Sequence, residues 1–212
     1  MKLSGLYAIT DEKLTPYEGG KIFRLVEKVL KGGARVVQLR DKNTPDEKLI
    51  PIALKLKELC HSYSAYFIVN DRVSLAKEIL ADGVHVGKDD EDISYVREVL
   101  PKTSIVGVSC YAALERAKRA EKLGASYVAF GSFFPSPTKP EAPLAPLEIL
   151  AQAKRELSIP ICAIGGITLD KAEILLEHGV DLIAVVSDLW TSDDPEARAR
   201  GYTELFKKHG KL

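Results

Sequence analysis

The sequence has little of several features that would place it in a specialised class. Its 212 residues include three widely spaced cysteines, Cys60, Cys110 and Cys162, and no Cys-x-x-Cys pair, so neither a zinc site nor a redox motif is expected. An odd number of scattered cysteines is typical of reduced thiols in a reducing compartment. The 30 Lys and Arg balance the 30 Asp and Glu. Without a basic excess, neither nucleic acid nor a membrane surface is expected as a partner.

Long apolar runs are also missing. The two longest uncharged stretches, 123–138 and 157–169, both contain glycine and proline, and neither reaches the roughly 20 apolar residues of a membrane-spanning helix. The opening residues, MKLSGLYAIT, are too few and too polar for a secretory signal peptide. These features predict a cytoplasmic protein. A hydrophobic content of 46% with zero formal net charge predicts a globular chain and excludes global disorder.

What the chain does have is a regular alternation of short runs rich in Val and Ile with longer amphipathic stretches. The predicted strands are 6–10, 36–40, 66–69, 84–86, 104–108, 127–130, 161–164 and 182–186. The predicted helices are 18–31, 45–62, 73–80, 93–100, 112–123, 146–157, 169–178 and 195–209. Thr44 is expected to cap the second helix, with Pro45 at its first position.

These eight strand–helix units predict the fold class. The apolar runs are mostly continuous, which is typical of parallel strands buried on both faces. Eight units in this length favour an α/β fold in which residues 1–212 form a single-domain TIM (β/α)8 barrel. A doubly wound open sheet is the alternative, but no Gly-x-Gly-x-x-Gly follows the first predicted strand.

In a TIM barrel the active site lies at the C-terminal ends of the strands, and polar residues gather there in this sequence. Alternate residues of a strand share a face, so Gln38 and Arg40 are expected to point into the barrel, with Lys42 at the rim. Two cations and an amide suit a polyanionic ligand. Alternatively, Arg40 and Lys42 pair with Asp41 or Asp46 at the surface.

Acidic residues follow the third and fourth predicted strands, which are neighbours in a barrel. Asn70 and Asp71 come after the third strand, and Asp89 and Asp90 after the fourth. Mg²⁺ is usually held by one or two carboxylates together with phosphate oxygens of a ligand, and Asp71 and Asp90 could hold it in this way. Alternatively, each caps the helix that follows it. His85 is expected to pack in the barrel wall.

The loop 131–143 after the sixth predicted strand supplies Ser136, Thr138 and Lys139. Loops of this length in compact proteins tend to be functional, although a merely solvated loop is the alternative.

A second anion site is expected where Gly165 and Gly166 end the seventh strand and Ser187 ends the eighth. Barrels of this fold often bind phosphate at these two loops, and glycine lets backbone N–H groups approach an anion closely. A simple turn at the glycines is the alternative. A metal-assisted diphosphate site beside a monophosphate site predicts a transferase.

The ordered set of motifs resembles the thiamine phosphate synthase family from residue 6 to about residue 206. The motifs are YAIT at 7–10, QLRDK at 38–42, VND at 69–71, ADGVHVG at 81–87, GVS at 107–109, PSPTK at 135–139, AIGGIT at 163–168 and AVVS at 184–187. The resemblance implies a TIM barrel that joins a hydroxymethylpyrimidine diphosphate to a thiazole monophosphate and releases pyrophosphate, with Mg²⁺. It also implies a dissociative displacement, in which pyrophosphate leaves before the thiazole nitrogen attacks.

The resemblance assigns a role to each candidate residue. Pyrophosphate binding falls to Arg40, Lys42, Asn70 and Lys139, and Mg²⁺ binding to Asp71 and Asp90. The pyrimidine would lie near Gln38 and Ser109, and the thiazole and pyrophosphate near Ser136 and Thr138. The thiazole phosphate would be bound by Gly166, Val186 and Ser187. Direct catalytic contributions are expected from Lys139, Arg40 and Ser109.

Three positions depart from the family pattern: Lys88 replaces a usual Gln, Ser136 a frequent Thr, and Tyr111 a common His. Related thiazole tautomerases have a His at this last place, so Tyr111 argues against that activity. A thiazole phosphate tautomerase and a non-catalytic binding or regulatory barrel remain the alternative functions. The expected partners are small molecules, and the sequence leaves homo-oligomerisation open.

Overall fold

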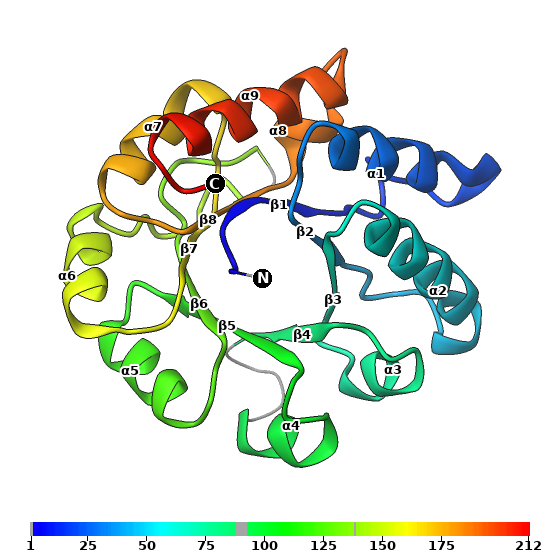
Figure 1. The fold of residues 1–212 in the computed structure, drawn as a ribbon, viewed down its shortest axis with the longest axis horizontal. Helices are drawn as coiled ribbons and strands as arrows, with labels where there is room; N and C mark the ends of the chain where they lie inside the picture. The colour runs from blue at the N-terminus through cyan, green and yellow to red at the C-terminus, as the bar shows by residue number, and fades with distance from the viewer. Residues whose placement is uncertain (1, 88–92, 138) are drawn as a thin grey trace.

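The structure, a computed structural model, describes residues 2–87, 93–137 and 139–212. Within these residues, eight parallel strands close into a barrel in sequence order (Figure 1). β1 pairs with both β2 and β8, so the sheet has no open edge. The TIM-barrel prediction is confirmed, and the doubly wound alternative is wrong. The strands are β1 Gly5–Ile9, β2 Val36–Leu39, β3 Tyr66–Asn70, β4 Gly83–Val86, β5 Ile105–Tyr111, β6 Tyr127–Phe130, β7 Ile161–Ala163 and β8 Leu182–Val185.

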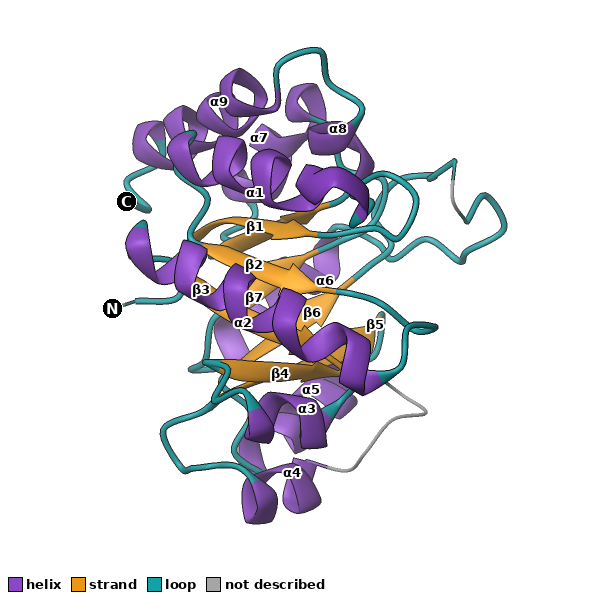
Figure 2. Ribbon diagram, turned by 90° about the vertical axis from the view of Figure 1, so that its right-hand side faces the viewer, coloured by secondary structure: helices purple, strands orange, loops and turns teal. Residues whose placement is uncertain are grey.

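Helices surround the barrel, and all strands point to the same end (Figures 1 and 2). Figure 2 shows both chain termini at the opposite end, while the loop between β6 and α6 projects from the end where the arrowheads lie. The helices are η1 Glu18–Gly20, a 3₁₀ turn, then α1 Lys21–Lys31, α2 Asp46–Ser62, α3 Val73–Glu78, α4 Ile93–Val99, α5 Leu114–Lys122, α6 Glu148–Glu156, α7 Leu169–Glu177, α8 Ser187–Trp190 and α9 Pro195–Lys208.

Four helices start later than predicted: α1, α2, α5 and α6, the last at Glu148 and not at residue 146. The stretch 18–31 is divided because Gly19 and Gly20 adopt positive φ values of 60° and 71°, which an α-helix cannot contain. The second helix begins at Asp46, one residue later than predicted. Pro45, with ψ of 146°, is its N-cap, and no side chain caps this helix, so Thr44 is not the cap.

Two further differences lie at the ends of strands. β5 continues to Tyr111, whose φ is 54°, so α5 starts at Leu114 and not at residue 112. The short helix α8 directly follows the eighth strand and was not predicted. A single turn of four residues is too short to produce a helical hydrophobic period in a sequence.

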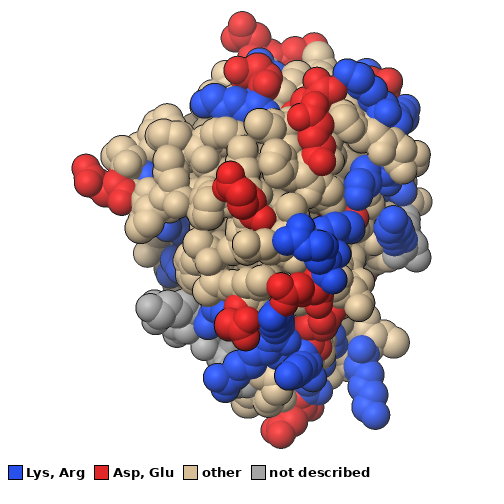
Figure 3. Space-filling model, turned by 90° about the vertical axis from the view of Figure 1, so that its left-hand side faces the viewer, with Lys and Arg blue, Asp and Glu red and all other residues tan. Residues whose placement is uncertain are grey.

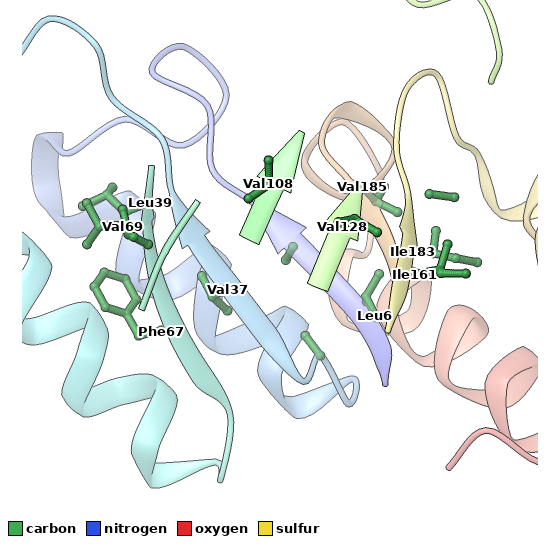
Figure 4. Packing of buried hydrophobic residues seen from close by; sticks show 14 of the residues in the cluster. Leu6, Val37, Leu39, Phe67, Val69, Val108, Val128, Ile161, Ile183 and Val185 are labelled. Atoms are coloured by element: carbon green, nitrogen blue, oxygen red, sulfur yellow. The ribbon is translucent and has the colours of Figure 1, made fainter. Parts of the chain in front are cut away.

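The core has two layers because alternate strand residues face opposite sides of the sheet. Outward side chains such as Leu6, Val37 and Phe67 pack between the strands and the helices (Figure 4). A second cluster, which includes Tyr7, Ile68 and Tyr127, fills the barrel interior. Because the interior is filled by side chains, polar side chains at the strand ends face an opening only at the rim.

The three cysteines are free thiols buried in the core, as expected, and burial raises the pKa of Cys110 to about 12. In the part of the chain that is described, no helix is long and apolar enough to cross a membrane. Figure 3 shows one face of the molecule, on which basic and acidic side chains are interspersed. A broad surface of one sign, as expected of a nucleic-acid binder, is not present on that face.

Candidate functional site

The segment after β2 carries the predicted cations on a firmly held loop. The buried Asp41 carboxylate accepts hydrogen bonds from the backbone N–H groups of Asn43 and Thr44, at 2.8 Å each, and from the Tyr17 hydroxyl at 2.5 Å. Burial alone would raise the pKa of the Asp41 carboxyl. Hydrogen bonds from Thr44, Tyr17 and Asn43 outweigh that effect and hold the pKa well below its ordinary value. Asp41 therefore remains a carboxylate and keeps the turn in shape.

The cation that serves this loop is Arg72 and not Arg40. The Arg72 guanidinium donates to the backbone oxygens of Thr44 and Asp41, at 2.6 and 2.9 Å, and to Asp46 Oδ1 at 2.7 Å. Arg40, by contrast, forms no ion pair within the described residues. The alternative in which Arg40 pairs with Asp41 or Asp46 is therefore wrong, and Arg40 is half-buried.

Lys42 and Asp71 meet at the adjoining ends of β2 and β3. Lys42 Nζ lies 3.3 Å from Asp71 Oδ2, and 23% of the Asp71 side chain is exposed. The β2–β3 register ends with Leu39 beside Val69, so one further residue brings Arg40 next to the buried Asn70. The N-cap of α3 is Arg72, which rules out Asp71 as the cap of that helix.

Of the two predicted metal ligands, the structure places only Asp71. Asp90 lies outside the described residues, as do Lys88 and Thr138. Within the described ranges, no three His, Cys, Asp or Glu side chains gather as a complete metal-binding group. A partly exposed carboxylate beside Asn70 is nevertheless the donor type that suits Mg²⁺ completed by phosphate oxygens.

A chain of buried hydrogen bonds crosses the barrel interior beneath these groups. Gln38 points inward as predicted, and its Nε2 donates to the Tyr7 hydroxyl at 2.7 Å. That hydroxyl lies 2.7 Å from the hydroxyl of Tyr127. His85 lies 2.8 Å from Tyr127 through Nδ1 and 2.8 Å from Ser109 Oγ through Nε2. His85 is buried as expected, but it is part of a polar network and does not merely pack in the wall.

The loop after β6 rests on the glycines that follow β7. Phe134 N donates to Gly165 O at 3.1 Å. Gly166 has φ of +65°, and a Cβ added there would lie 2.3 Å from Phe134 O and 2.5 Å from Pro135 O. Only glycine fits this close approach. The two predicted features, the long loop and the Gly-Gly pair, thus form one structure.

Farther along the same loop, Ser136 is half-buried and Lys139 is exposed. Ser136 and Lys139 form an isolated antiparallel bridge. The Lys139 side chain is exposed and makes no ion pair within the described parts of the chain. The structure therefore places Lys139 on the loop at the rim but does not bring it into contact with Arg40 or Lys42.

The predicted second anion site offers two backbone N–H groups. The β7–β8 register ends with Ala163 beside Ile183, so the segments that carry Gly166 and Val186 leave these neighbouring strands at the same end of the barrel. Neither the N–H of Gly166 nor that of Ser187 has an acceptor among the described residues. The neighbouring Asp188 accepts from Leu169 N at 3.0 Å and Tyr202 Oη at 2.6 Å, and therefore has a structural role.

Sequence reasoning missed Arg72, Tyr7 and Tyr127 as residues that support the site. A signal for the tyrosines was present, because strand alternation places Tyr7 and Tyr127 on the same inward faces as Gln38 and Ser109. No comparable signal existed for Arg72. Its partners lie in a loop about 30 residues earlier in the chain, and local spacing does not encode that contact.

The chain is similar to proteins of one family over nearly its whole length. A family model described as thiamine monophosphate synthase matches residues 6–189. Thiamine-phosphate synthases from Thioalkalivibrio sulfidiphilus and Methylobacillus flagellatus are 43% and 46% identical, each over at least 96% of both chains. The solved thiamine phosphate pyrophosphorylase from Pyrococcus furiosus superposes with a TM-score of 0.89 at 36% identity, covering 98% of each chain.

More distant barrels share only the fold. A geranylgeranylglyceryl phosphate synthase from Thermoplasma acidophilum has a TM-score of 0.72 at 16% identity, and a 3-hexulose-6-phosphate synthase from Salmonella typhimurium gives the same two values. The full-length match, the closed barrel and the strand-end site agree, and the chain belongs to the thiamine monophosphate synthase family.

Proposed function

We propose that this chain joins a 4-amino-5-hydroxymethyl-2-methylpyrimidine diphosphate to a thiazole monophosphate, and that different residues at the strand ends bind the diphosphate, the pyrimidine and the thiazole phosphate. Its activity is that of its family, a transferase reaction that yields thiamine phosphate. The observation that supports this division is the ion pair of Lys42 with Asp71, 3.3 Å apart, at the strand ends that also carry Arg40, a residue with no ion pair among the described residues. This end of the barrel offers both cations and a carboxylate to a diphosphate.

The residues that bind the diphosphate stabilise the charge that develops when it leaves. The C–O bond between the pyrimidine methylene and the diphosphate breaks, and its electron pair leaves with the diphosphate oxygen. Arg40 and Lys42 stabilise the charge that develops on that oxygen, with Asn70 as a further donor. Lys139, Ser136 and Thr138 would add donors from the loop after β6. This stabilisation lowers the barrier without any proton transfer from the protein.

Asp71 and Asp90 are the residues that would hold Mg²⁺. Bound there with phosphate oxygens of the substrate, Mg²⁺ would neutralise part of the charge on the leaving group. Asp71 itself would orient the Lys42 ammonium through their ion pair of 3.3 Å.

The pyrimidine would lie over the buried network. Gln38 and Ser109 stand at the two ends of that network, on β2 and β5. They would hold the ring while the amino group donates electron density to the methylene cation. Ser109, Arg40 and Lys139 are the residues that would act directly in catalysis.

The thiazole phosphate would bind at the opposite side of the barrel mouth. The N–H groups of Gly166 and Ser187, which have no acceptor in the described ranges, would donate to its oxygens, and Val186 would flank the ring. This anchoring would direct the thiazole nitrogen to the methylene carbon, where its lone pair forms the new C–N bond.

A coupling assay tests this function. Purified protein with both substrates and Mg²⁺ is expected to form thiamine phosphate and pyrophosphate in equal amounts, and neither product when one substrate is omitted. Isomerisation of the thiazole phosphate without coupling would instead support a tautomerase. Saturable thiazole phosphate binding without any product would support a non-catalytic barrel.

A further inference from the structure

The buried hydrogen-bond chain from Gln38 to Ser109 has a direction that follows from counting its protons. Burial raises the pKa of both the Tyr7 and the Tyr127 phenol, so each keeps one O–H donor. Gln38 Nε2 already donates to the Tyr7 oxygen. The remaining Tyr7 proton has one partner within 2.7 Å besides Gln38, the hydroxyl of Tyr127, and a buried donor left without an acceptor is costly.

The same donor-to-acceptor order continues from Tyr127 through His85. Because Tyr127 accepts from Tyr7, its own proton points to His85 Nδ1, 2.8 Å away. Nδ1 must therefore be the acceptor, and a neutral imidazole carries its proton on the other nitrogen. His85 Nε2–H then donates to Ser109 Oγ at 2.8 Å. The Ser109 proton is left to point elsewhere, and it has no acceptor within the described residues.

The two ends of the hydrogen-bond network offer opposite groups to a ligand, an acceptor at Gln38 and a donor at Ser109. The amide nitrogen of Gln38 donates to the Tyr7 hydroxyl, so its Oε1 is the acceptor left for a ligand. No described residue donates to this oxygen. Among the described residues, Arg35 Nε is the side-chain polar atom that is both fully buried and without a hydrogen-bond partner, and Gln38 Oε1 is not such an atom. Gln38 Oε1 therefore reaches accessible space. Reversing the chain would require every proton to move and the Gln38 amide to turn over.

The packing of the barrel interior leaves room for this hydrogen-bond network. A Cβ on Gly107 would lie 2.0 Å from Tyr127 Cζ and 2.2 Å from its hydroxyl oxygen, so Gly107 leaves the space that the phenol fills. The rings of His85 and Tyr127 stack with centroids 5.6 Å apart. Five different strands contribute one residue each, and a small shift of any strand would break a hydrogen bond.

We propose that Tyr7, Tyr127 and His85 are positioning residues that lock Gln38 as an acceptor and Ser109 as a donor, and so select an aminopyrimidine over its oxo analogue. This inference rests on the proposed function. An exocyclic amine donates and a neighbouring ring nitrogen accepts, which matches an acceptor at Gln38 and a donor at Ser109. A 4-oxo pyrimidine presents the opposite pattern at both atoms. Its oxygen would face the acceptor of Gln38 and its ring N–H would face the donor of Ser109, so neither hydrogen bond would form.

The tautomer of His85 can be measured without any substrate. Long-range ¹H–¹⁵N correlation spectra of the histidine rings are expected to show His85 neutral, with its proton on Nε2. His85→Asn identifies its signals among those of His61, His178 and His209. A proton on Nδ1, or exchange between the two tautomers, would overturn the inference. Since this readout needs no activity, it separates failure of the lock from failure of the proposed reaction.

Kinetics test the selection itself. Tyr127→Phe removes the link between Tyr7 and His85, and the ratio of kcat/KM for the 4-amino substrate to that for the 4-oxo analogue is expected to fall about tenfold or more. The matched control is Tyr63→Phe. It removes a hydroxyl that bonds Glu27 on the outer surface, at 2.9 Å, and should leave the ratio unchanged. An unchanged ratio in Tyr127→Phe would contradict the lock.

A double-mutant cycle distinguishes positioning from general stabilisation. If the chain acts through Ser109, the effects of Tyr127→Phe and Ser109→Ala on kcat/KM are expected to be strongly non-additive. Additive effects would mean that Tyr127 only supports the fold. If Tyr127→Phe fails to fold, Tyr7→Phe takes its place in the cycle, and the histidine spectrum of the unaltered protein still decides the direction of the chain.

Discussion

Asp71→Asn is expected to lower the rate of thiamine phosphate formation about 100- to 1,000-fold, the range seen when one group that stabilises a developing charge is removed. The substitution removes a carboxylate that would hold Mg²⁺ and that orients Lys42, 3.3 Å away. It keeps the size of the side chain. Asp71 has a positive φ of 62°, a conformation that asparagine adopts readily, so the backbone gains no strain.

The fold should survive this change because the ion pair is partly exposed. Such pairs contribute about 0–1 kcal/mol to stability, so the unfolding midpoint in urea should shift little. Thiazole phosphate binding, measured by calorimetry, should also be unchanged because its proposed site is at the end of β7 and β8. Asp193→Asn, on an exposed residue that makes no hydrogen bond or ion pair in the described chain, serves as the control. Coupling at the unaltered rate in Asp71→Asn would disprove the role of Asp71.

Gly166→Ala is expected to weaken thiazole phosphate binding about 100-fold, because two costs act on the same backbone. A non-glycine residue at positive φ costs about 1–2 kcal/mol. The added Cβ would also lie 2.3 Å from Phe134 O and 2.5 Å from Pro135 O. Either the loop after β6 or the Gly166 N–H must move, and both belong to the proposed phosphate site. Direct titration with thiazole phosphate, without the pyrimidine substrate, measures the effect.

Gly19→Ala is the matched control for this variant. Gly19 has a similar φ of 60°, and a Cβ there meets nothing within 4 Å, so it carries the conformational cost without the collision. It lies in η1, before α1, and should bind thiazole phosphate normally. Equal affinity in Gly166→Ala and the unaltered protein would show that the phosphate binds elsewhere.

The barrel was predictable because its strands carry a strong local signal. Runs such as Ile161–Ala163 and Leu182–Val185 are apolar on both faces, and glycine or charged residues separate them from amphipathic helices. Boundaries were less predictable. The division of the stretch 18–31 depends on the backbone conformation of Gly19 and Gly20, and a helical period in the sequence continues unbroken across such a kink.

The site was predictable where it depends on strand ends and not where it depends on loop contacts. Lys42 and Asp71 follow neighbouring strands in register, and their side chains lie 3.3 Å apart in the structure. The identity of the cation that holds Asp41 did not follow, because Arg40 and Arg72 are equally plausible by spacing and only the folded loop selects Arg72. The roles of Ser136 and Lys139 toward a ligand stay predictions.

The polar interior was missed for a different reason. His85 and Tyr127 are 42 residues apart in the sequence, and an inward residue of either type can be a simple core residue. The hydrogen bonds form only when barrel closure fixes the position of each strand along the barrel axis. Strand alternation indicates which residues face inward, but the register decides which of those residues meet.

The most direct test is the metal dependence of coupling by the unaltered protein. Both substrates are supplied at saturating concentration, first with Mg²⁺, then with excess chelator, and then with Mg²⁺ restored. Thiamine phosphate formation is expected in the first state, to fall to background in the second and to recover in the third. Coupling that continues under chelation, or no coupling at all despite saturable thiazole phosphate binding, would contradict a metal-assisted transfer at this end of the barrel.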